Sequence, residues 1–262
     1  MNEKIIKEFK RKISSGRPVF GPFMKTCDPG FVEAVGYAGM DFAILDMEHG
    51  PISIQNMQNN IRAAQLSGVL PVIRVSSISE SDIGKALDIG AAAIEIPQIS
   101  TADEAKKAIH YAKFYPEGER GVCRFVRAAH YSGMDRNEYF KNSNNTIIIA
   151  QIEGVEAIKN LDSILDVEGI DILFIGPYDL SQSLGVAGQT TNPKVIEAMN
   201  SIVKKAKEKD VVIGTFTDSH ETMEMWMKAG VQYISYSVDM GIFYESCKNL
   251  TNKFHEIECC LE

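Results

Sequence analysis

The sequence lacks the features that mark membrane, secreted and nucleic-acid-binding proteins. No apolar run approaches the roughly 20 residues of a membrane-spanning helix. Residues 1–13 alternate charged and apolar side chains, so the continuous apolar stretch of a signal peptide is absent. Lys and Arg number 27 against 35 Asp and Glu, which gives a net charge of -8 without any basic run. We therefore expect neither a membrane nor a nucleic acid as a partner.

Cysteine is also scarce, and its spacing excludes two further classes of protein. The five cysteines are Cys27, Cys123, Cys247, Cys259 and Cys260. An odd number without C-x-x-C spacing indicates neither a disulfide framework nor a zinc site, so we expect reduced thiols and a cytoplasmic protein. The sequence also has no P-loop, no G-x-S-x-G elbow and no dinucleotide-binding glycine fingerprint.

Short apolar runs alternate with longer amphipathic segments along all 262 residues. The candidate strands are residues 19–23, 42–46, 71–75, 93–97, 147–153, 172–176, 211–216 and 233–238. The candidate helices are residues 29–38, 54–66, 82–89, 102–114, 155–167, 193–209 and 221–229, with a closing segment at 240–259. Left-handed glycine caps are expected at Gly39, Gly68, Gly90 and Gly230. Eight βα repeats without a compositional break predict an α/β fold, a single (β/α)8 TIM barrel that spans residues 1–262 as one domain.

One connection is much longer than the others. Residues 115–145 precede the fifth candidate strand, and a connection of this length is usually functional or covers another part of the protein. Arg120 and Arg127 within it are candidate contacts to an acidic substrate or to a neighbouring subunit.

Polar residues follow several candidate strands at the end where the loops of a barrel form its active site. They are Asp46, Glu48, His49, Arg74, Glu153, Asp179, Ser181, Ser237 and Asp239. Glu153 and Asp179 each follow an apolar strand, so the barrel would bring two carboxylates together as a site for Mg²⁺ or Mn²⁺. Alternatively, each carboxylate caps the helix that follows it.

Three further side chains have chemistry that suits a catalytic site. His49, three residues after Asp46, would be oriented by that carboxylate and would transfer a proton near neutral pH. Arg74 ends an apolar strand, so it either pairs with a neighbouring carboxylate or holds an anionic group of the substrate. Lys25 follows the first strand and is a candidate Schiff-base amine.

Several segments resemble the HpcH/HpaI family of metal-dependent pyruvate aldolases. The resemblance covers the chain from about Gly16 to the last helix, and its most specific parts are DMEHG, QIEGVEA and GPYDLS in this order. It implies a barrel of the phosphoenolpyruvate/pyruvate-binding type. It also implies a class II aldolase that cleaves a 4-hydroxy-2-oxo acid to pyruvate and an aldehyde through a metal-stabilised enolate.

The resemblance also implies functions for individual residues. Glu153 and Asp179 would bind the divalent metal (Mg²⁺, Mn²⁺ or Co²⁺), while Arg74, His49 and Asp46 would be catalytic. The residues expected to border the substrate are Gln151, Gly176, Pro177, Tyr178, Phe23 and Phe216. Backbone N–H groups of residues 176–179 would receive the substrate carboxylate. Family members pair by exchanging the last helix and form hexamers, so a homo-oligomer is expected.

Some residues near the expected metal site differ from the family pattern. Phe23 stands where the relatives that cleave the hydroxyheptenedioate carry Trp, Tyr178 and Lys25 replace small residues, and Ser237 replaces a Gly. These differences leave the pyruvate half of the substrate credible and the aldehyde undetermined. Oxaloacetate-type decarboxylation through the same enolate, a Schiff-base aldolase through Lys25, and a barrel that only binds a keto acid are the alternatives.

Overall fold

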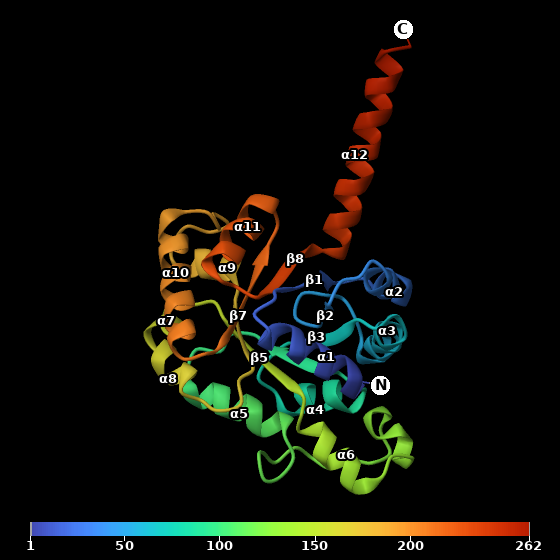
Figure 1. Cartoon of the computed structure of the whole chain (residues 1–262), viewed down its shortest axis with the longest axis vertical. Helices are drawn as coiled ribbons and strands as arrows, with labels where there is room; N and C mark the ends of the chain where they lie inside the picture. The colour runs from blue at the N-terminus through green and yellow to red at the C-terminus, as the bar shows by residue number, and fades with distance from the viewer. Residues whose placement is uncertain (1, 262) are drawn as a thin grey trace.

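Eight parallel strands close into a barrel in the order in which they occur in the sequence (Figure 1). The computed structural model describes residues 2–261; the predicted domain span of 1–262 also includes Met1 and Glu262, which lie outside the described residues. The strands are β1 (Val19–Met24), β2 (Phe42–Asp46), β3 (Leu70–Arg74), β4 (Ala93–Ile96), β5 (Ile147–Ile152), β6 (Ile172–Ile175), β7 (Val212–Thr217) and β8 (Tyr233–Val238). The predicted (β/α)8 barrel is confirmed.

Helices surround the barrel and connect its strands (Figure 1). They are α1 (Asn2–Ser14), α2 (Pro29–Tyr37), α3 (Ile54–Ser67), α4 (Glu80–Asp88), α5 (Ala102–Ala112), the 3-10 helix η1 (Arg127–Ser132), α6 (Arg136–Ser143), α7 (Val155–Lys159), α8 (Leu161–Leu165), α9 (Pro177–Ser183), α10 (Pro193–Glu208), α11 (His220–Ala229) and α12 (Asp239–Cys259). The four glycines expected to end helices all have positive φ, at 85°, 83°, 100° and 97°. Left-handed backbone after a helix redirects the chain toward the next strand, as the sequence predicted.

Inward-facing side chains fill the barrel, and α1 closes its N-terminal end. Phe42 and Tyr233, at the starts of β2 and β8, stack with their ring centroids 4.0 Å apart. Phe9 of α1 lies 6.3 Å from each of these rings. Ile6 and Ile13 belong to the same buried cluster, and their spacing from Phe9 places all three on one face of the helix. α1 is thus part of the barrel core, a contribution that the sequence interpretation did not include.

Two predicted segments have more structure than expected. The candidate helix at 155–167 is divided into α7 and α8 at Asn160, whose side-chain Nδ2 donates to the carbonyl of Ser100 at 2.9 Å. The long connection at 115–145 contains η1 and α6. Ala129 and Tyr139 of this connection form a small core with Phe114, which precedes it, and this packing holds the connection in place.

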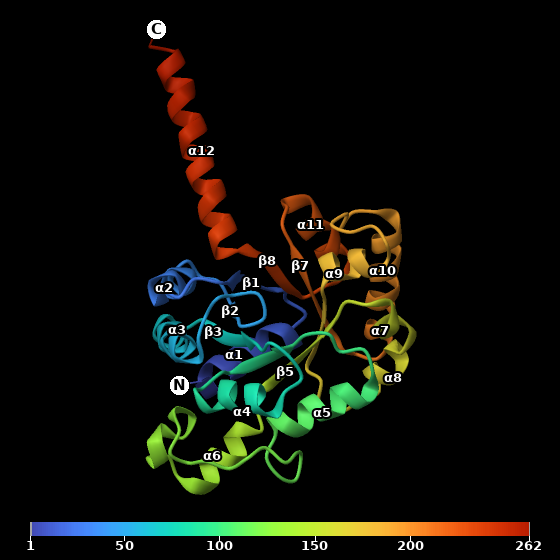
Figure 2. The same cartoon turned by 180° about the vertical axis from the view of Figure 1, so that it is seen from behind.

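The last helix, α12, extends away from the barrel, and Figures 1 and 2 show its free end far from every strand. Asp239 is its only buried residue within the described chain. Its exposed apolar side chains include Phe243, Tyr244, Leu250 and Phe254. Among residues 2–261, no helix is both long and apolar enough to cross a membrane.

The packing of α1 can be tested by Phe9→Ala. This change removes a buried ring from the closed end of the barrel, so we expect the free energy of unfolding to fall by about 3–5 kcal/mol in urea denaturation. Phe125→Ala is the matched control, because Phe125 is 78% exposed and should change stability by about 0.5 kcal/mol or less. Equal effects of the two substitutions would show that α1 does not pack on the barrel.

Candidate active site

A buried ion pair joins β2 and β3 at the mouth of the barrel. The strand register places Asp46 beside Arg74, whose Nε and Nη2 donate to the two carboxylate oxygens at 2.9 and 2.8 Å. The guanidinium carbon lies 4.5 Å from the ring centroid of Phe23. Burial raises the pKa of Asp46, but the hydrogen bonds and charge of Arg74 outweigh burial and lower that pKa below its usual value. The pairing therefore fixes a charged guanidinium in one position.

Glu48 contacts the remaining side of the same guanidinium. Its Oε2 lies 3.1 Å from Arg74 Nη1, and its Oε1 accepts from Gln98 Nε2 at 3.3 Å. Burial raises the pKa of Glu48, although the charges of Arg74 and His49 oppose this effect. The sequence shows only that Glu48 follows a strand, because its contact with Arg74 depends on how the loop folds.

The structure does not pair the side chains of Asp46 and His49. Asp46 Oδ1 accepts from the backbone N–H of His49 at 3.3 Å, and both carboxylate oxygens bind Arg74. The imidazole is 58% exposed, with Nε2 3.9 Å from Glu48 Oε2. The spacing of the two residues therefore forms a turn after β2, and the carboxylate beside the imidazole is Glu48.

Glu153 lies just beyond β5 and is held by the neighbouring loops. Its Oε1 accepts from the backbone N–H of Gln98 at 2.9 Å, and its Oε2 accepts from the side chain of Gln151. Gly176 allows this arrangement, because a Cβ atom on it would lie 2.6 Å from Glu153 Oε2. Gln98 itself has φ of 60°, a left-handed conformation that is uncommon for a residue other than glycine.

The capping interpretation of the two expected metal ligands does not agree with the structure. The N-cap of α7 is Gly154 and that of α9 is Gly176, and neither helix has a side-chain cap. Asp179 is exposed in the first turn of α9, close enough to Glu153 and Glu48 to affect both electrostatically. Burial, together with the charges of Asp179 and Glu48, raises the pKa of Glu153 to about 7. Repulsion among these carboxylates would be relieved by a cation.

Aromatic side chains form a wall beside the ion pair. The ring centroid of Phe216 lies 6.0 Å from that of Phe23 and 5.9 Å from that of Tyr178. The Tyr178 hydroxyl donates to Asp218, and this hydrogen bond, with burial, raises its pKa to about 12. The wall thus presents apolar rings and a phenol that stays protonated at neutral pH.

Lys25 also lies at the mouth of the barrel. Its Nζ is 3.8 Å from Asp46 Oδ2, and its backbone N–H donates to Asp239 Oδ2 at 2.9 Å.

Among residues 2–261, no group of three or more His, Cys, Asp or Glu side chains is placed to hold a metal ion. A metal at this site would therefore need ligands from water or substrate in addition to Glu153 and Asp179.

Glu95 is a site residue that the sequence interpretation missed. The register of β3 and β4 places its backbone beside that of Arg74, and its side chain is completely buried. Neither of its carboxylate oxygens has a hydrogen-bond partner. Burial raises its pKa to about 8, against the attraction of Arg74. The available signal was a lone carboxyl within the apolar run AAAIEIP.

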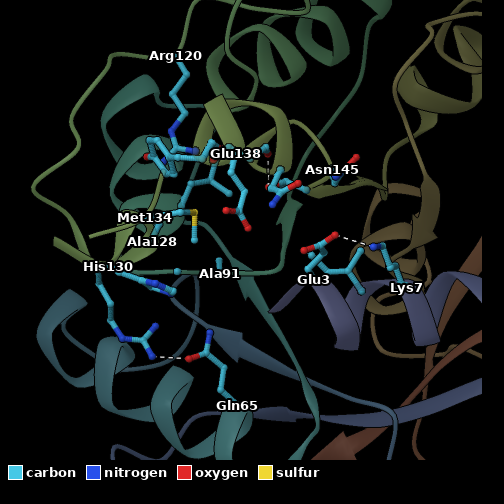
Figure 3. A pocket seen from close by; sticks show the side chains of 18 of the residues that line it. Glu3, Lys7, Gln65, Ala91, Arg120, Ala128, His130, Met134, Glu138 and Asn145 are labelled. Carbon is cyan, nitrogen blue, oxygen red and sulfur yellow. Dashed lines mark hydrogen bonds and ion pairs between the residues drawn. The ribbon is translucent and has the colours of Figure 1, made fainter. Parts of the chain in front are cut away.

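Arg120 and Arg127 do not join this site. Both line a cavity near the starts of β4 and β5, at the opposite end of the barrel (Figure 3). They cannot contact a substrate at Arg74 of the same chain.

Comparisons with known proteins agree with the resemblance found in the sequence. A profile of the HpcH/HpaI aldolase/citrate lyase family matches residues 20–246. A hydroxypyruvate/pyruvate aldolase of Roseobacter denitrificans is 30% identical over 248 residues, covering 95% of this chain and 97% of that protein. A 4-hydroxy-2-oxo-heptane-1,7-dioate aldolase of Escherichia coli is also 30% identical, covering 94% of each chain. The crystal structure of an HpcH/HpaI aldolase/citrate lyase family protein from Burkholderia cenocepacia superposes with a TM-score of 0.90 at 28% identity, covering 95% of this chain and 99% of that chain.

The buried carboxyl of Glu95 predicts a pH-dependent effect on stability. A pKa of about 8 in the folded protein, above the unfolded value of about 4.3, means that the folded state binds more protons between these pH values. The free energy of unfolding contributed by this group therefore falls as pH rises from about 4.3 to about 8. Gln carries no charge at either pH, so the free energy of unfolding of Glu95→Gln should not show this fall. Measured relative to wild type, it should be higher at pH 9 than at pH 5 by up to about 4 kcal/mol.

Chemical denaturation at the two pH values measures this difference. Glu168→Gln, an exposed position, is the control and should have the same small effect at both pH values. An effect of Glu95→Gln that does not change between pH 5 and pH 9 would mean that Glu95 titrates normally.

Proposed function

Because the chain belongs to the HpcH/HpaI aldolase/citrate lyase family, we propose that it is a class II aldolase that splits a 4-hydroxy-2-oxo acid into pyruvate and an aldehyde. The chain is accordingly a carbon–carbon lyase, as its sequence predicted. The observation that carries the proposal is the guanidinium of Arg74, fixed by Asp46 at the same mouth of the barrel as the carboxylates of Glu153 and Asp179. This combination suits a reaction in which negative charge develops on an oxygen atom.

Glu153 and Asp179 would hold a divalent cation such as Mg²⁺, Mn²⁺ or Co²⁺. Oxygen ligands suit these ions, and the pKa of Glu153 near 7 reflects a carboxylate that lacks a compensating positive charge. The Oε1 atom of Gln151 is buried beside Glu153 without a hydrogen-bond partner among the described residues. When bound, the cation would act as a Lewis acid on the keto group of the substrate.

Arg74 would stabilise the enolate that forms when the bond between C3 and C4 breaks. The electron pair of that bond moves toward C2, and negative charge accumulates on the C2 oxygen. Asp46 accepts hydrogen bonds from two of the five N–H groups of Arg74, and Glu48 lies 3.1 Å from Nη1, so N–H groups remain for the substrate. Because the guanidinium is already fixed, little reorganisation is needed as the charge develops.

His49 would transfer the protons in this reaction, and Glu48 would orient it. Cleavage requires a base that removes the proton of the C4 hydroxyl, and the resulting enolate must then be protonated at C3 to give pyruvate. His49 is exposed at the mouth and lies beside Glu48, which would orient the imidazole. Asp46 acts through Arg74 in this arrangement.

The remaining site residues would position the substrate. No side chain caps α9, and Pro177 has no N–H, so the backbone N–H groups of Tyr178 and Asp179 would receive the substrate carboxylate. Phe23, Phe216 and Tyr178 would border the aldehyde portion. This wall favours an aldehyde with an apolar part.

We also propose that the enzyme is a homo-oligomer in which copies exchange α12. A helix of 21 residues that is exposed over nearly its whole length, with Tyr244, Leu250 and Phe254 exposed to solvent, is not expected to be stable alone. The family resemblance gives a hexamer as the expected assembly. The cytoplasm is the proposed location, because all five cysteines are free thiols.

Two other reactions use the same residues and are outcomes of the test. Decarboxylation of an oxaloacetate-type acid would pass through the same enolate at Arg74 and release pyruvate without an aldehyde. A Schiff-base aldolase would use Lys25, whose Nζ lies at the mouth of the barrel near Asp46.

The proposed reaction is tested by pyruvate release from a panel of 4-hydroxy-2-oxo acids. We expect turnover by the Mg²⁺- or Mn²⁺-reconstituted enzyme, little turnover after chelation, and a loss of at least about 100-fold in Glu153→Gln. Glu156→Gln, an exposed position three residues away, is the control and should keep wild-type turnover. Coupling to lactate dehydrogenase measures pyruvate, and a hydrazine reagent measures the aldehyde.

Each alternative gives a different result in this assay. Pyruvate released from oxaloacetate without an aldehyde would indicate the decarboxylase. Turnover that survives chelation, with borohydride trapping of pyruvate on Lys25, would indicate the Schiff-base mechanism and would exclude the metal-dependent proposal.

The pKa of Glu153 predicts that metal affinity depends on pH. Because a carboxyl must lose its proton to bind a cation, affinity for Mn²⁺ should fall as pH decreases below about 7. Titration calorimetry at pH 6 and pH 8 measures this change. Equal affinity at the two pH values would contradict a raised pKa for this ligand.

Gly176 is predicted to be required for the geometry of Glu153. Gly176→Ala would place a Cβ atom 2.6 Å from Glu153 Oε2, so we expect at least about tenfold lower turnover and weaker Mn²⁺ binding. Gly84→Ala is the matched control, because its Cβ would meet no atom within 4 Å. Wild-type turnover in Gly176→Ala would show that Glu153 can move without loss of function.

A further inference from the structure

A cavity of about 660 Å³ lies at the end of the barrel opposite to Arg74 (Figure 3). Its lining comes from α1, α3 and α4, from the turn before β4, from the residues before β5 and from the long connection that contains η1 and α6. Its volume is within the range of small-molecule sites in proteins. The catalytic residues described above contribute nothing to it, so any ligand here would have a separate function.

The cations that line this cavity differ in their partners. Lys7 pairs with Glu3 at 2.6 Å, Lys10 with Asp171 at 2.9 Å and Arg120 with Asp88 at 2.6 Å. Arg127 has no carboxylate partner among the residues that the structure describes. Its Nη1 donates to the carbonyl of Ile89 at 3.0 Å and its Nη2 donates to the side chain of Gln65.

The environment of Arg127 is unfavourable for a lone positive charge. Burial lowers its pKa, and the nearby charge of Arg62 lowers it further. In a chain with net charge -8, a half-buried guanidinium beside another cation would be expected to have an acidic partner. Its unused N–H groups can bind a carboxylate in the two-pronged geometry that arginine favours.

The opposite side of the cavity carries the opposite charge. Figure 3 shows the carboxylate of Glu138 directed into the cavity, on the far side from Gln65, to which Arg127 is bonded. Within the described chain, Glu138 has no basic partner for that carboxylate. The other acidic lining residue, Glu3, is already neutralised by Lys7.

Apolar side chains occupy the space between the two charges. Ala91 lies between Glu138 and Gln65 in Figure 3, Met134 lies beside Glu138, and Ile6 and Leu87 also line the cavity. A ligand that matched this surface would have a carboxylate at one end, a cationic nitrogen at the other and a short aliphatic chain between them.

We propose that this cavity binds an amino carboxylic acid whose carboxylate contacts Arg127 and whose distal ammonium or guanidinium contacts Glu138. Lysine, ornithine and arginine present this chemistry, and 6-aminohexanoate presents it without an α-ammonium group. Gln65 orients the guanidinium of Arg127, and Met134 contacts the aliphatic chain. The proposal does not depend on the reaction assigned to the other end of the barrel.

Titration calorimetry with the full-length protein tests this site, with L-lysine and 6-aminohexanoate as probes. Hexanoate and hexylamine each retain one of the two charges, and each should bind at least about tenfold more weakly than 6-aminohexanoate. Glu138→Gln should weaken 6-aminohexanoate by a similar factor and leave hexanoate unchanged. Arg127→Gln should weaken 6-aminohexanoate and hexanoate together. Because Glu138 is exposed, Glu138→Gln should keep the wild-type melting temperature, and this measurement is the folding control.

Two results would overturn the proposal. One is the absence of saturable binding by either probe at millimolar concentration. The other is binding that neither substitution weakens, which would place the probe elsewhere on the protein. Calorimetry reports binding at this cavity and not turnover at Arg74. Absence of binding would therefore leave the aldolase proposal unaffected, and absence of aldolase activity would leave this proposal unaffected.

Discussion

The ion pair between Asp46 and Arg74 is the interaction on which the rest of the site depends. Both groups are buried, and the strand register brings them together without help from any loop. Neither charge could remain in this position alone, because an unpaired buried charge is strongly destabilising. Glu48 and Phe23 then pack on the guanidinium, so the loop after β2 and the end of β1 are positioned relative to it. The barrel thereby places a fixed positive charge within a group of carboxylates.

The carboxylates around this pair give the site an excess of acidic groups. Glu95 and Glu153 both have raised pKa values, since each is buried and surrounded by other acids. Glu153 faces the mouth, where a cation could reach it, whereas Glu95 lies beneath Arg74 and is fully enclosed. Two acids with similar causes for their pKa shifts are therefore suited to different tasks, one to bind a cation and one to stay neutral.

The hydrophobic pattern predicted the barrel well, because the strands are mostly apolar runs and several helices are followed by a glycine such as Gly68 or Gly230. It also placed Asp46, Arg74, Glu153 and Asp179 at one end of the barrel, since that conclusion needs only strand ends. Pairing between side chains was harder to predict. Sequence left open whether Arg74 binds a carboxylate or a substrate, and only the register of β2 and β3 assigns Asp46 to it. The imidazole of His49 lies beside Glu48 rather than Asp46, because the turn after β2, and not the strand register, sets its position.

The position of α12 affects what stability means for this protein. After Asp239 the helix leaves the barrel, so the apolar side chains along it contribute little to the folding of their own chain. If copies exchange α12 as proposed, these side chains would stabilise the protein through contacts between molecules, and the extent of such contacts depends on protein concentration. The melting temperature of this protein would then depend on its concentration as well as on its sequence. In that assembly, dilution alone would lower the melting temperature without any change in the contacts inside the barrel.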